Sequence, residues 1–431
     1  MYCQLEALRH CLPPSVARIL EELPETLDET YERVLREINK ANREHARRLL
    51  QCLTVALRPL RVEEFAEILA INFNTPSQEG IPQLNPNWRW ADQHQAVLST
   101  CSSLIAIVDD GGSKVVQFSH FSVKEYLTSD RLACSSRDVS QYHIVLEPAH
   151  TILAQACLGV LLRLDDRVDK YNVGGIPLVM YAAQYWVDHA QFEKVASRIR
   201  DAMNYFFDAD KPHWAAWCRV QMIDKKWSSF YPEELQDVFP LYYASLGGFY
   251  DLAEHLVGKH PEQINARGGR MGTPLVAALR GKHFEVAELL HRNGADVDVR
   301  DKYEDTLLRE ACRGQVPDIV QWLLNHGADA NGRGQYSPPL TAAASSGCLK
   351  EVQMLLEHNA DIHIRFSGMT PLHAAADSDV LPNKVDIMQV LLDYGAIIDA
   401  EDIRGRTPLQ LALEKRRDDI ATWLKERGAT R

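Results

Sequence analysis

The chain has 431 residues, a formal net charge of −12 and an apolar fraction of 46%. At about 100–200 residues per domain, this length predicts two to four folded units. The acidic balance argues against nucleic-acid binding by bulk electrostatics, and the apolar content argues against a disordered chain.

The chain is expected to lie in the cytoplasm, with the nucleus as the alternative. Its nine cysteines include no CxxC pair, so they indicate reduced thiols. The first residues, MYCQLEALRHCLPPS, lack the apolar core of a signal peptide. The longest apolar run, 152–162, is interrupted by Gln155 and is too short to span a bilayer. We therefore expect neither secretion nor membrane insertion.

Helices are predicted in the first hundred residues. One begins in the segment Leu23–Tyr31 and runs to about Asn42, with its apolar residues near one face; two more follow at about 45–57 and 62–71. A loop rich in Asn, Pro and Gly then precedes a helix that ends near Ser103.

A hairpin follows, with strands at 104–108 and 115–118 joined by Asp-Asp-Gly-Gly-Ser, whose glycines supply the positive φ angles of a tight turn. A helix resumes at Phe121. This order predicts a winged-helix domain over residues 45–133. Winged helices often bind DNA, but residues 91–100 before the hairpin carry no Lys or Arg for phosphate contacts. DNA binding is kept as a minor alternative, and no nucleic-acid partner is expected.

Residues 134–235 are predicted to form a helical linker. Its aromatic residues are expected to cluster and to pack against the repeats that follow: Phe206, Phe207, Trp214, Trp217 and Trp227.

The last third of the chain repeats itself. A Thr or its replacement is followed by a Gly or its replacement at intervals of 21, 21, 21, 25 and 21 residues: Thr273 to Gly294, Thr306 to Gly327, Pro338 to Asn359, Thr370 to Gly395, and Thr407 to Gly428. The starts are 33, 32, 32 and 37 residues apart. This period is typical of ankyrin repeats. With a degenerate first copy at Phe239-Pro240-Leu241, we predict about six repeats over residues 236–431.

Each repeat has a mechanical interpretation. Thr caps the first helix, Pro fits its first position, and paired alanines one turn later let neighbouring helices approach. The second helix ends at a residue that tolerates positive φ, which is Gly in most copies and Asn359 in one. The last helix is highly charged, as a terminal repeat facing water should be. About four extra residues near 377–384 predict a longer loop inside the fifth repeat.

The N-terminal half resembles a second family. Phe118-Ser119-His120-Phe121-Ser122-Val123-Lys124-Glu125-Tyr126 is similar to a signature in the winged helix of NACHT-type receptors, which are signalling NTPases of the STAND class. The segments at 23–35 and 181–189 are similar to those that flank this domain in fungal members, which often end in ankyrin repeats. By this resemblance, residues 1–44 are the helical remnant that joins a NACHT core.

The resemblance implies that His120 contacts the terminal phosphate of a bound nucleotide when a NACHT core is attached. The alternative is a histidine bonded to local backbone at a strand-to-helix junction. The chain contains no GxxxxGK[ST], so it looks like the C-terminal part of such a receptor. A truncated gene model, a natural fragment and a stand-alone adaptor all fit. No cofactor is expected, and ATP or GTP would bind only with a NACHT core.

No enzyme motif was found. The sequence has no HExxH, no GxSxG and no Cys/His cluster at zinc spacing, so we predict a protein without catalytic or metal-binding residues. His291, His326 and His358 are predicted to lie at corresponding places at the ends of second helices, where they bond free carbonyl groups or interact with the helix dipole.

We predict that the protein acts as an adaptor whose ankyrin array binds another protein, with the N-terminal half as the regulatory part of a NACHT-ankyrin receptor. The alternative is a nucleotide-dependent switch whose P-loop is supplied upstream or in trans. Large apolar residues recur just before each Thr position, edged by arginines, and this composition is typical of binding hot spots. The predicted partner-binding residues are Met271, Tyr303, Tyr336, Phe366 and Ile403, with Arg270, Arg300, Arg333, Arg365 and Arg404. The alternative is that neighbouring loops pack these side chains against each other.

Overall fold

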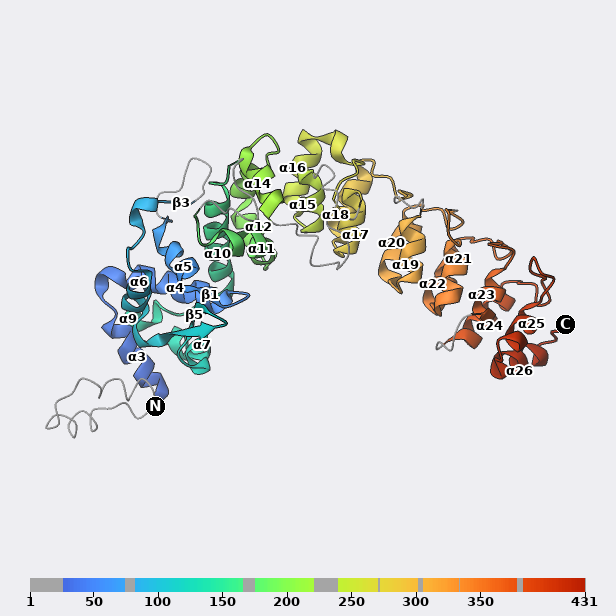
Figure 1. Ribbon diagram of the computed structural model, residues 1–431, viewed down its shortest axis with the longest axis horizontal. Helices are drawn as coiled ribbons and strands as arrows, with labels where there is room; N and C mark the ends of the chain where they lie inside the picture. The colour runs from blue at the N-terminus through green and yellow to red at the C-terminus, as the bar shows by residue number, and fades with distance from the viewer. Residues whose placement is uncertain are drawn as a thin grey trace. The chain divides into compact units, whose positions relative to one another are not determined.

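The computed structural model describes residues 26–73, 82–165, 175–220, 239–269, 272–300, 305–332, 334–377 and 383–430. The chain divides into two compact units, Met1–Glu234 and Leu235–Arg431. Helices dominate both units, as the sequence predicts (Figure 1). No helix in these ranges is long and apolar enough to cross a bilayer.

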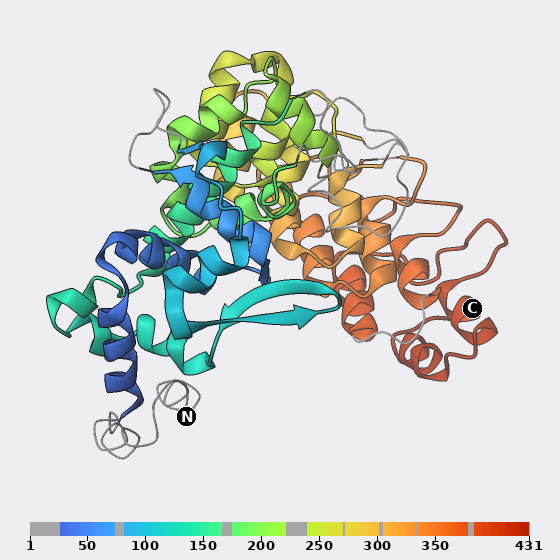
Figure 2. The same ribbon diagram turned by 60° about the vertical axis from the view of Figure 1, so that its left-hand side comes forward.

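The first part of the N-terminal unit has the predicted winged-helix order. Its helices are α3 (Leu27–Glu37), η1 (Lys40–Asn42), α4 (Arg43–Val55), α5 (Val62–Glu67), η2 (Ile68–Ala70), η3 (Pro86–Trp88), α6 (Gln93–Cys101), η4 (Ser102–Leu104) and α7 (Phe121–Leu127). Its strands are β1 (Leu60–Arg61), β2 (Ile71–Asn72), β3 (Gln83–Leu84), β4 (Ile105–Asp110) and β5 (Ser113–Phe118). The predicted hairpin is the long cyan pair of strands in Figure 2.

A three-stranded antiparallel sheet holds this domain together. Its order is β1-β5-β4, and Val116 of β5 pairs with Leu60 on one side and Ile107 on the other. At the hairpin turn, Gly111 and Gly112 have φ angles of 58° and 88°, as the tight turn requires. Strand β1 was not predicted, because two residues are too few to show an alternating pattern.

The first predicted helix is shorter than expected. Thr26 caps α3, and its hydroxyl oxygen accepts the N–H of Glu29 at 3.2 Å. The helix ends at Glu37 instead of Asn42. Asn39 starts a new turn by accepting the N–H of Ala41 at 3.0 Å, because asparagine offers the backbone a bond that competes with helix continuation.

The second part of the N-terminal unit is helical. Its helices are α8 (Asp130–Ala133), α9 (Arg137–Ser140), α10 (Leu146–Leu161), α11 (Val179–Ala190), α12 (Val195–Arg198), α13 (Arg200–Phe206) and α14 (Pro212–Val220). Four of the five aromatic residues expected to cluster do so around Trp186 of α11: Phe206, Phe207, Trp214 and Trp217. Trp227 lies outside the described residues. The cluster is the core of this helical part.

A chain of polar contacts through the buried Tyr181 and His189 links the segment after α4 to α11 and α10. The Leu57 N–H donates to the Tyr181 hydroxyl at 3.2 Å, and that hydroxyl lies 2.8 Å from His189 Nε2. His189 Nδ1 lies 2.9 Å from His150 Nδ1, within hydrogen-bond distance. Burial lowers the pKa of His189 to about 3, with a smaller contribution from His150, and burial also lowers the pKa of His150.

The C-terminal unit stacks six helix pairs within its described residues, shown from yellow to red in Figure 1. The first helices of the pairs are α15 (Pro240–Leu246), α17 (Pro274–Arg280), α19 (Leu307–Arg313), α21 (Pro339–Ser346), α23 (Pro371–Asp377) and α25 (Pro408–Glu414). The second helices are α16 (Tyr250–Lys259), α18 (Phe284–Arg292), α20 (Pro317–Asn325), α22 (Leu349–Glu357), α24 (Lys384–Asp393) and α26 (Asp418–Glu426), and η6 (Pro261–Gln263) follows α16. The extra residues of the fifth repeat, 378–382, lie outside the described ranges.

The predicted start and stop signals are confirmed. Thr273, Thr306 and Thr407 cap α17, α19 and α25. Asn359 has φ 61°, in the same left-handed region as the glycines that end the other second helices.

Small residues lie at several of the contacts between the first helices of neighbouring repeats. The alanine pairs of α17 and α21 are fully buried, and α21 packs closely on both α19 and α23. In α19, Glu310 stands where α17 has Ala277. Helix α19 packs less closely on α17 than on α21, and the Arg280–Glu310 ion pair bridges α17 and α19.

Replacing Leu324 with Ala should lower the free energy of unfolding by about 2–5 kcal/mol, because this leucine is buried in α20 against its neighbours. Replacing Asn359 with Gly should leave stability unchanged or raise it slightly, because glycine adopts positive φ without strain. Urea unfolding of both variants measures the two changes. A marked loss for the glycine variant would show that the Asn359 side chain, and not its backbone angle, matters.

Stability should fall as the pH is lowered from about 6.5 towards 3. The unfolded chain binds a proton at His189 below its ordinary pKa of 6.5, whereas the folded chain resists that proton down to about pH 3. The contribution of the His189 pKa shift to the free energy of unfolding is therefore complete above pH 6.5 and is lost progressively below it. Urea unfolding of wild type and His189→Gln between pH 7 and 4.5 should show the steeper decline in wild type. His255→Gln, at an exposed position on α16, is the control; parallel curves for wild type and His189→Gln would refute the assignment.

Candidate protein-interaction edge

The loops between repeats form one edge of the C-terminal unit, and we call them fingers. The first to fifth fingers are residues 264–273, 293–306, 326–338, 358–370 and 394–407. Each is short and is connected to the next by side-chain bonds to backbone.

A ladder of hydrogen bonds runs along the fingers. At four steps, a side-chain oxygen of one finger accepts the backbone N–H of a residue about one repeat further on. The pairs are Asn265 with Asp296 (2.9 Å), Asp298 with Asp329 (3.0 Å), Asn331 with Asp361 (2.7 Å) and Asp399 with Thr430 (3.2 Å). These bonds join the first four fingers to one another and the fifth finger to the segment after α26, so they hold side chains on the edge in place.

The ladder is not among the features predicted from the sequence, although the sequence carries a signal for it. Acceptors Asn265, Asp298 and Asn331 recur at the repeat period, and Asp399 follows two periods later. Asn and Asp in loops are usually interpreted as turn residues that bond to nearby backbone. Here, some fingers use such residues both for bonds within the finger and for bonds to the backbone of the neighbouring repeat. Their bonds to the neighbouring repeat become visible only when the repeats are stacked.

The predicted apolar residues of the edge differ in exposure. Tyr336 is 42% exposed, and the Arg309 guanidinium of α19 lies 4.7 Å from its ring centroid. Phe366 is half-buried and pairs its backbone with Met369. Ile403 is 76% exposed, although its Cγ2 lies against Gly368 of the preceding finger. Both expected behaviours therefore occur: Ile403 contacts a neighbouring finger and still presents apolar surface.

The arginines have defined partners on the fingers. Arg365 spans two fingers, because its Nη1 donates to the Gly368 carbonyl at 3.1 Å and to the Glu401 carbonyl at 2.7 Å. The Arg300 carbonyl accepts from Arg267, and Arg404 is exposed. The other predicted residues, Arg270, Met271, Tyr303 and Arg333, lie outside the described part of the chain.

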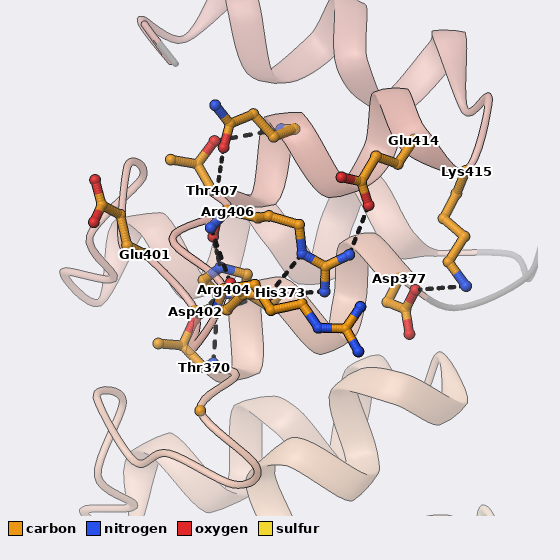
Figure 3. Close-up of polar contacts among 12 residues, drawn as sticks. Thr370, His373, Asp377, Glu401, Asp402, Arg404, Arg406, Thr407, Glu414 and Lys415 are labelled. Carbon is orange, nitrogen blue, oxygen red and sulfur yellow. Dashed lines mark hydrogen bonds and ion pairs between the residues drawn. The ribbon is translucent and has the colours of Figure 1, made fainter.

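Below the last fingers, a polar cluster ties the fifth repeat to the sixth (Figure 3). His373 Nδ1 lies 2.8 Å from the Thr370 hydroxyl, and its Nε2 donates to the Arg406 carbonyl at 3.0 Å. Burial would raise the pKa of the Asp402 carboxyl, but bonds from the backbone and guanidinium of Arg406 and from the Arg404 N–H lower it to about 2. These bonds keep the fifth finger rigid beneath Ile403.

Two of the three histidines assigned to helix ends bond carbonyl groups as predicted. His326 and His358 donate from Nδ1 to the carbonyls four residues earlier, at 2.7 and 2.8 Å. The assignment of His291 to a corresponding place was wrong. Asn293 occupies that place and donates to the Leu289 carbonyl at 2.8 Å, whereas His291 Nδ1 is buried without a partner. No group of three or more His, Cys, Asp or Glu in the described ranges could hold a metal ion.

His120 has the local role that was weighed as its alternative, and it also keeps a free donor. Its Nδ1 accepts the Ser122 N–H at 3.3 Å and so caps α7. Ser122 Oγ lies 2.6 Å from the same Nδ1 and 2.7 Å from the Tyr31 hydroxyl. Because Nδ1 accepts, the hydrogen of the neutral ring is on Nε2, which makes no bond within the described structure. His120 is exposed beside Phe121, which is itself 70% exposed.

Two families match the two units. Three overlapping matches to ankyrin repeats cover residues 241–333, 275–366 and 340–430, and residues 31–137 match the winged helix domain described for GPI inositol-deacylase. The C-terminal unit therefore consists of ankyrin repeats, and the N-terminal unit contains a winged-helix domain.

Individual proteins are also similar to this chain. An azaphilone pigments biosynthesis cluster protein L from Monascus ruber is 30% identical over 297 residues, which are 64% of this chain and 61% of that protein. The chain thus spans less than two thirds of this relative. The crystal structure of an ankyrin repeat domain from Acinetobacter baumannii is 29% identical and matches over its whole length and 45% of this chain, with a TM-score of 0.41. Another ankyrin-repeat crystal structure is 25% identical over 43% of this chain and 96% of its own, with a TM-score of 0.39.

Proposed function

We propose that the finger edge recognises a partner protein whose surface is acidic and studded with apolar side chains. The observation that carries this proposal is that Tyr336 and Ile403 stay exposed on fingers held by the hydrogen-bond ladder. Apolar and aromatic groups that are rigid before binding lose little conformational entropy when they are covered, and arginines beside them attract carboxylates. The protein acts by binding and not by catalysis.

We further propose that the N-terminal unit is the regulatory part of a NACHT-type receptor. Support comes from the winged-helix match over residues 31–137 and from the exposed Nε2–H of His120, which is a suitable donor to a phosphate. In the alternative function, a nucleotide-dependent switch, the same donor would sense a nucleotide held by a P-loop supplied upstream or in trans. The proposed location is the cytoplasm or nucleus, where thiols such as those of Cys52 and Cys157 stay reduced.

Replacing Tyr336, Phe366 and Ile403 together with Ser should reduce recovery of partner proteins from cell lysate by at least about tenfold, because hot-spot residues dominate binding energy. Circular dichroism and melting temperature check that the variant folds. A matched control replaces Tyr250 and Val385 with Ser, since both are exposed on second helices away from the fingers. Unchanged recovery with unchanged folding would refute the proposal, and a loss of folding would favour packing between fingers as the role of these residues.

The 431-residue chain should not bind ATP, GTP or ADP at micromolar concentrations. Phosphate binding of that strength needs a loop of converging backbone N–H groups and a P-loop lysine, and His120 offers only one donor. Calorimetric titration with each Mg-nucleotide and with ADP measures this. A dissociation constant in the low micromolar range would favour the switch as the function of this chain.

A further inference from the structure

The ladder along the fingers is interrupted at one step. The acceptors Asn265, Asp298 and Asn331 are followed, one repeat later, by His363, and then by Asp399. The residue whose N–H would be accepted at this step is Ile397, the counterpart of Asp361. No bond joins His363 to Ile397, so the fourth and fifth fingers lack the side-chain rung that the neighbouring steps have.

The fifth finger also lacks an internal hydrogen bond that the second, third and fourth fingers have near their start. In the second, third and fourth fingers, an Asp carboxylate accepts the N–H two residues on, as Asp361 does from His363 at 2.9 Å. Ile397 replaces that Asp and offers no acceptor. Within the described structure, the N–H groups of Ile397 and Asp399 therefore have no protein acceptor.

At the interrupted step there is a small hollow, lined by the Arg365 side chain and by the apolar side chain of Ile397. It has a volume of about 60 Å³, enough for a group the size of a carboxylate, and its lining includes His363, Arg365, Thr370 and Ile397. Arg365 is fixed there because its Nη1 bonds two carbonyls, while its other guanidinium nitrogens have no partner within the described residues. Ile397 is 59% exposed and Ile403, on the same finger, is 76% exposed.

The carboxylates of Asp361, Asp399 and Asp402, which lie on the same two fingers as this hollow, each already accept a hydrogen bond or form an ion pair. Asp361 accepts the His363 N–H, Asp399 is bonded by Thr430, and Asp402 is paired with Arg406. Arg365 forms no ion pair with any carboxylate in the described structure, although it is exposed. A backbone N–H without an acceptor and an unpaired guanidinium are both complementary to an incoming carboxylate.

We propose that the interrupted step between His363 and Ile397 is a docking site for an Asp or Glu side chain of the partner protein, next to an apolar residue that covers Ile397 and Ile403. The partner's carboxylate accepts the Ile397 N–H and so takes the place of the side-chain oxygen that Asn265, Asp298, Asn331 and Asp399 provide at the other steps. Arg365 binds its second oxygen. This inference rests on the proposed function of the finger edge.

The test uses the full chain and a displayed library of random twelve-residue peptides as the probe. Peptides selected by the wild-type chain should share an Asp or Glu beside an apolar residue, and raised salt should weaken their binding. His363→Asp restores the missing rung, so it should weaken the selected peptides at least about tenfold and raise the melting temperature. His255→Asp, which adds the same charge at an exposed position on α16, should leave their binding unchanged.

The other outcomes separate this inference from the proposed function. Selected peptides that lack Asp and Glu, or that bind His363→Asp as well as wild type, overturn the docking site. Suppose that these same peptides still bind the triple variant, in which Ser replaces Tyr336, Phe366 and Ile403, more weakly than wild type. In that case the finger edge is still the binding surface, and only the docking site is refuted. If no peptide is selected, or if binding is indifferent to both variants, both proposals fail.

Discussion

Close contact between the first helices of neighbouring repeats is the constraint on which the C-terminal unit depends. A single helix pair cannot bury both of its apolar faces, so each repeat is stable only against the next. Buried alanines such as Ala277 and Ala343 allow that contact. At the junction of the second and third repeats, Glu310 occupies an alanine position, and its ion pair with Arg280 bridges α17 and α19. Surface ion pairs stabilise little, so this junction depends more on its neighbours.

The regular arrangement of the fingers follows from this stacking. Because the repeats are held at a regular spacing, an Asn or Asp in one finger reaches the backbone of the next, as Asn331 reaches Asp361. A regular ladder satisfies backbone groups internally and leaves little for a partner to bond. Where the ladder stops, between His363 and Ile397, backbone donors and exposed aliphatic surface appear at the same place. The proposed docking site thus arises from a departure from the repeat pattern and not from the pattern itself.

The N-terminal unit is stabilised differently. Its winged helix is organised by a small sheet and by buried acids with fixed partners. Burial would raise the pKa of the fully buried Glu64, but bonds from Arg58 and from the Arg61 N–H outweigh it and lower the pKa. Its helical part relies on rings packed around Trp186. A rigid body of this kind can hold His120 at a strand-to-helix junction with its Nε2–H directed away from local bonds, which is what the proposed regulatory role requires.

The sequence by itself determined the repeat period, the helix caps, the left-handed Asn359 and the hairpin, because each depends on the preferences of neighbouring residues. It also selected Tyr336 and Ile403 as exposed edge residues. Only the tertiary structure decided which side chains bond across fingers, that Asn293 and not His291 bonds a carbonyl at its helix end, and where the ladder is interrupted. Those features depend on distances between residues about thirty positions apart, and packing sets such distances, whereas local preference sets only the angles of the chain.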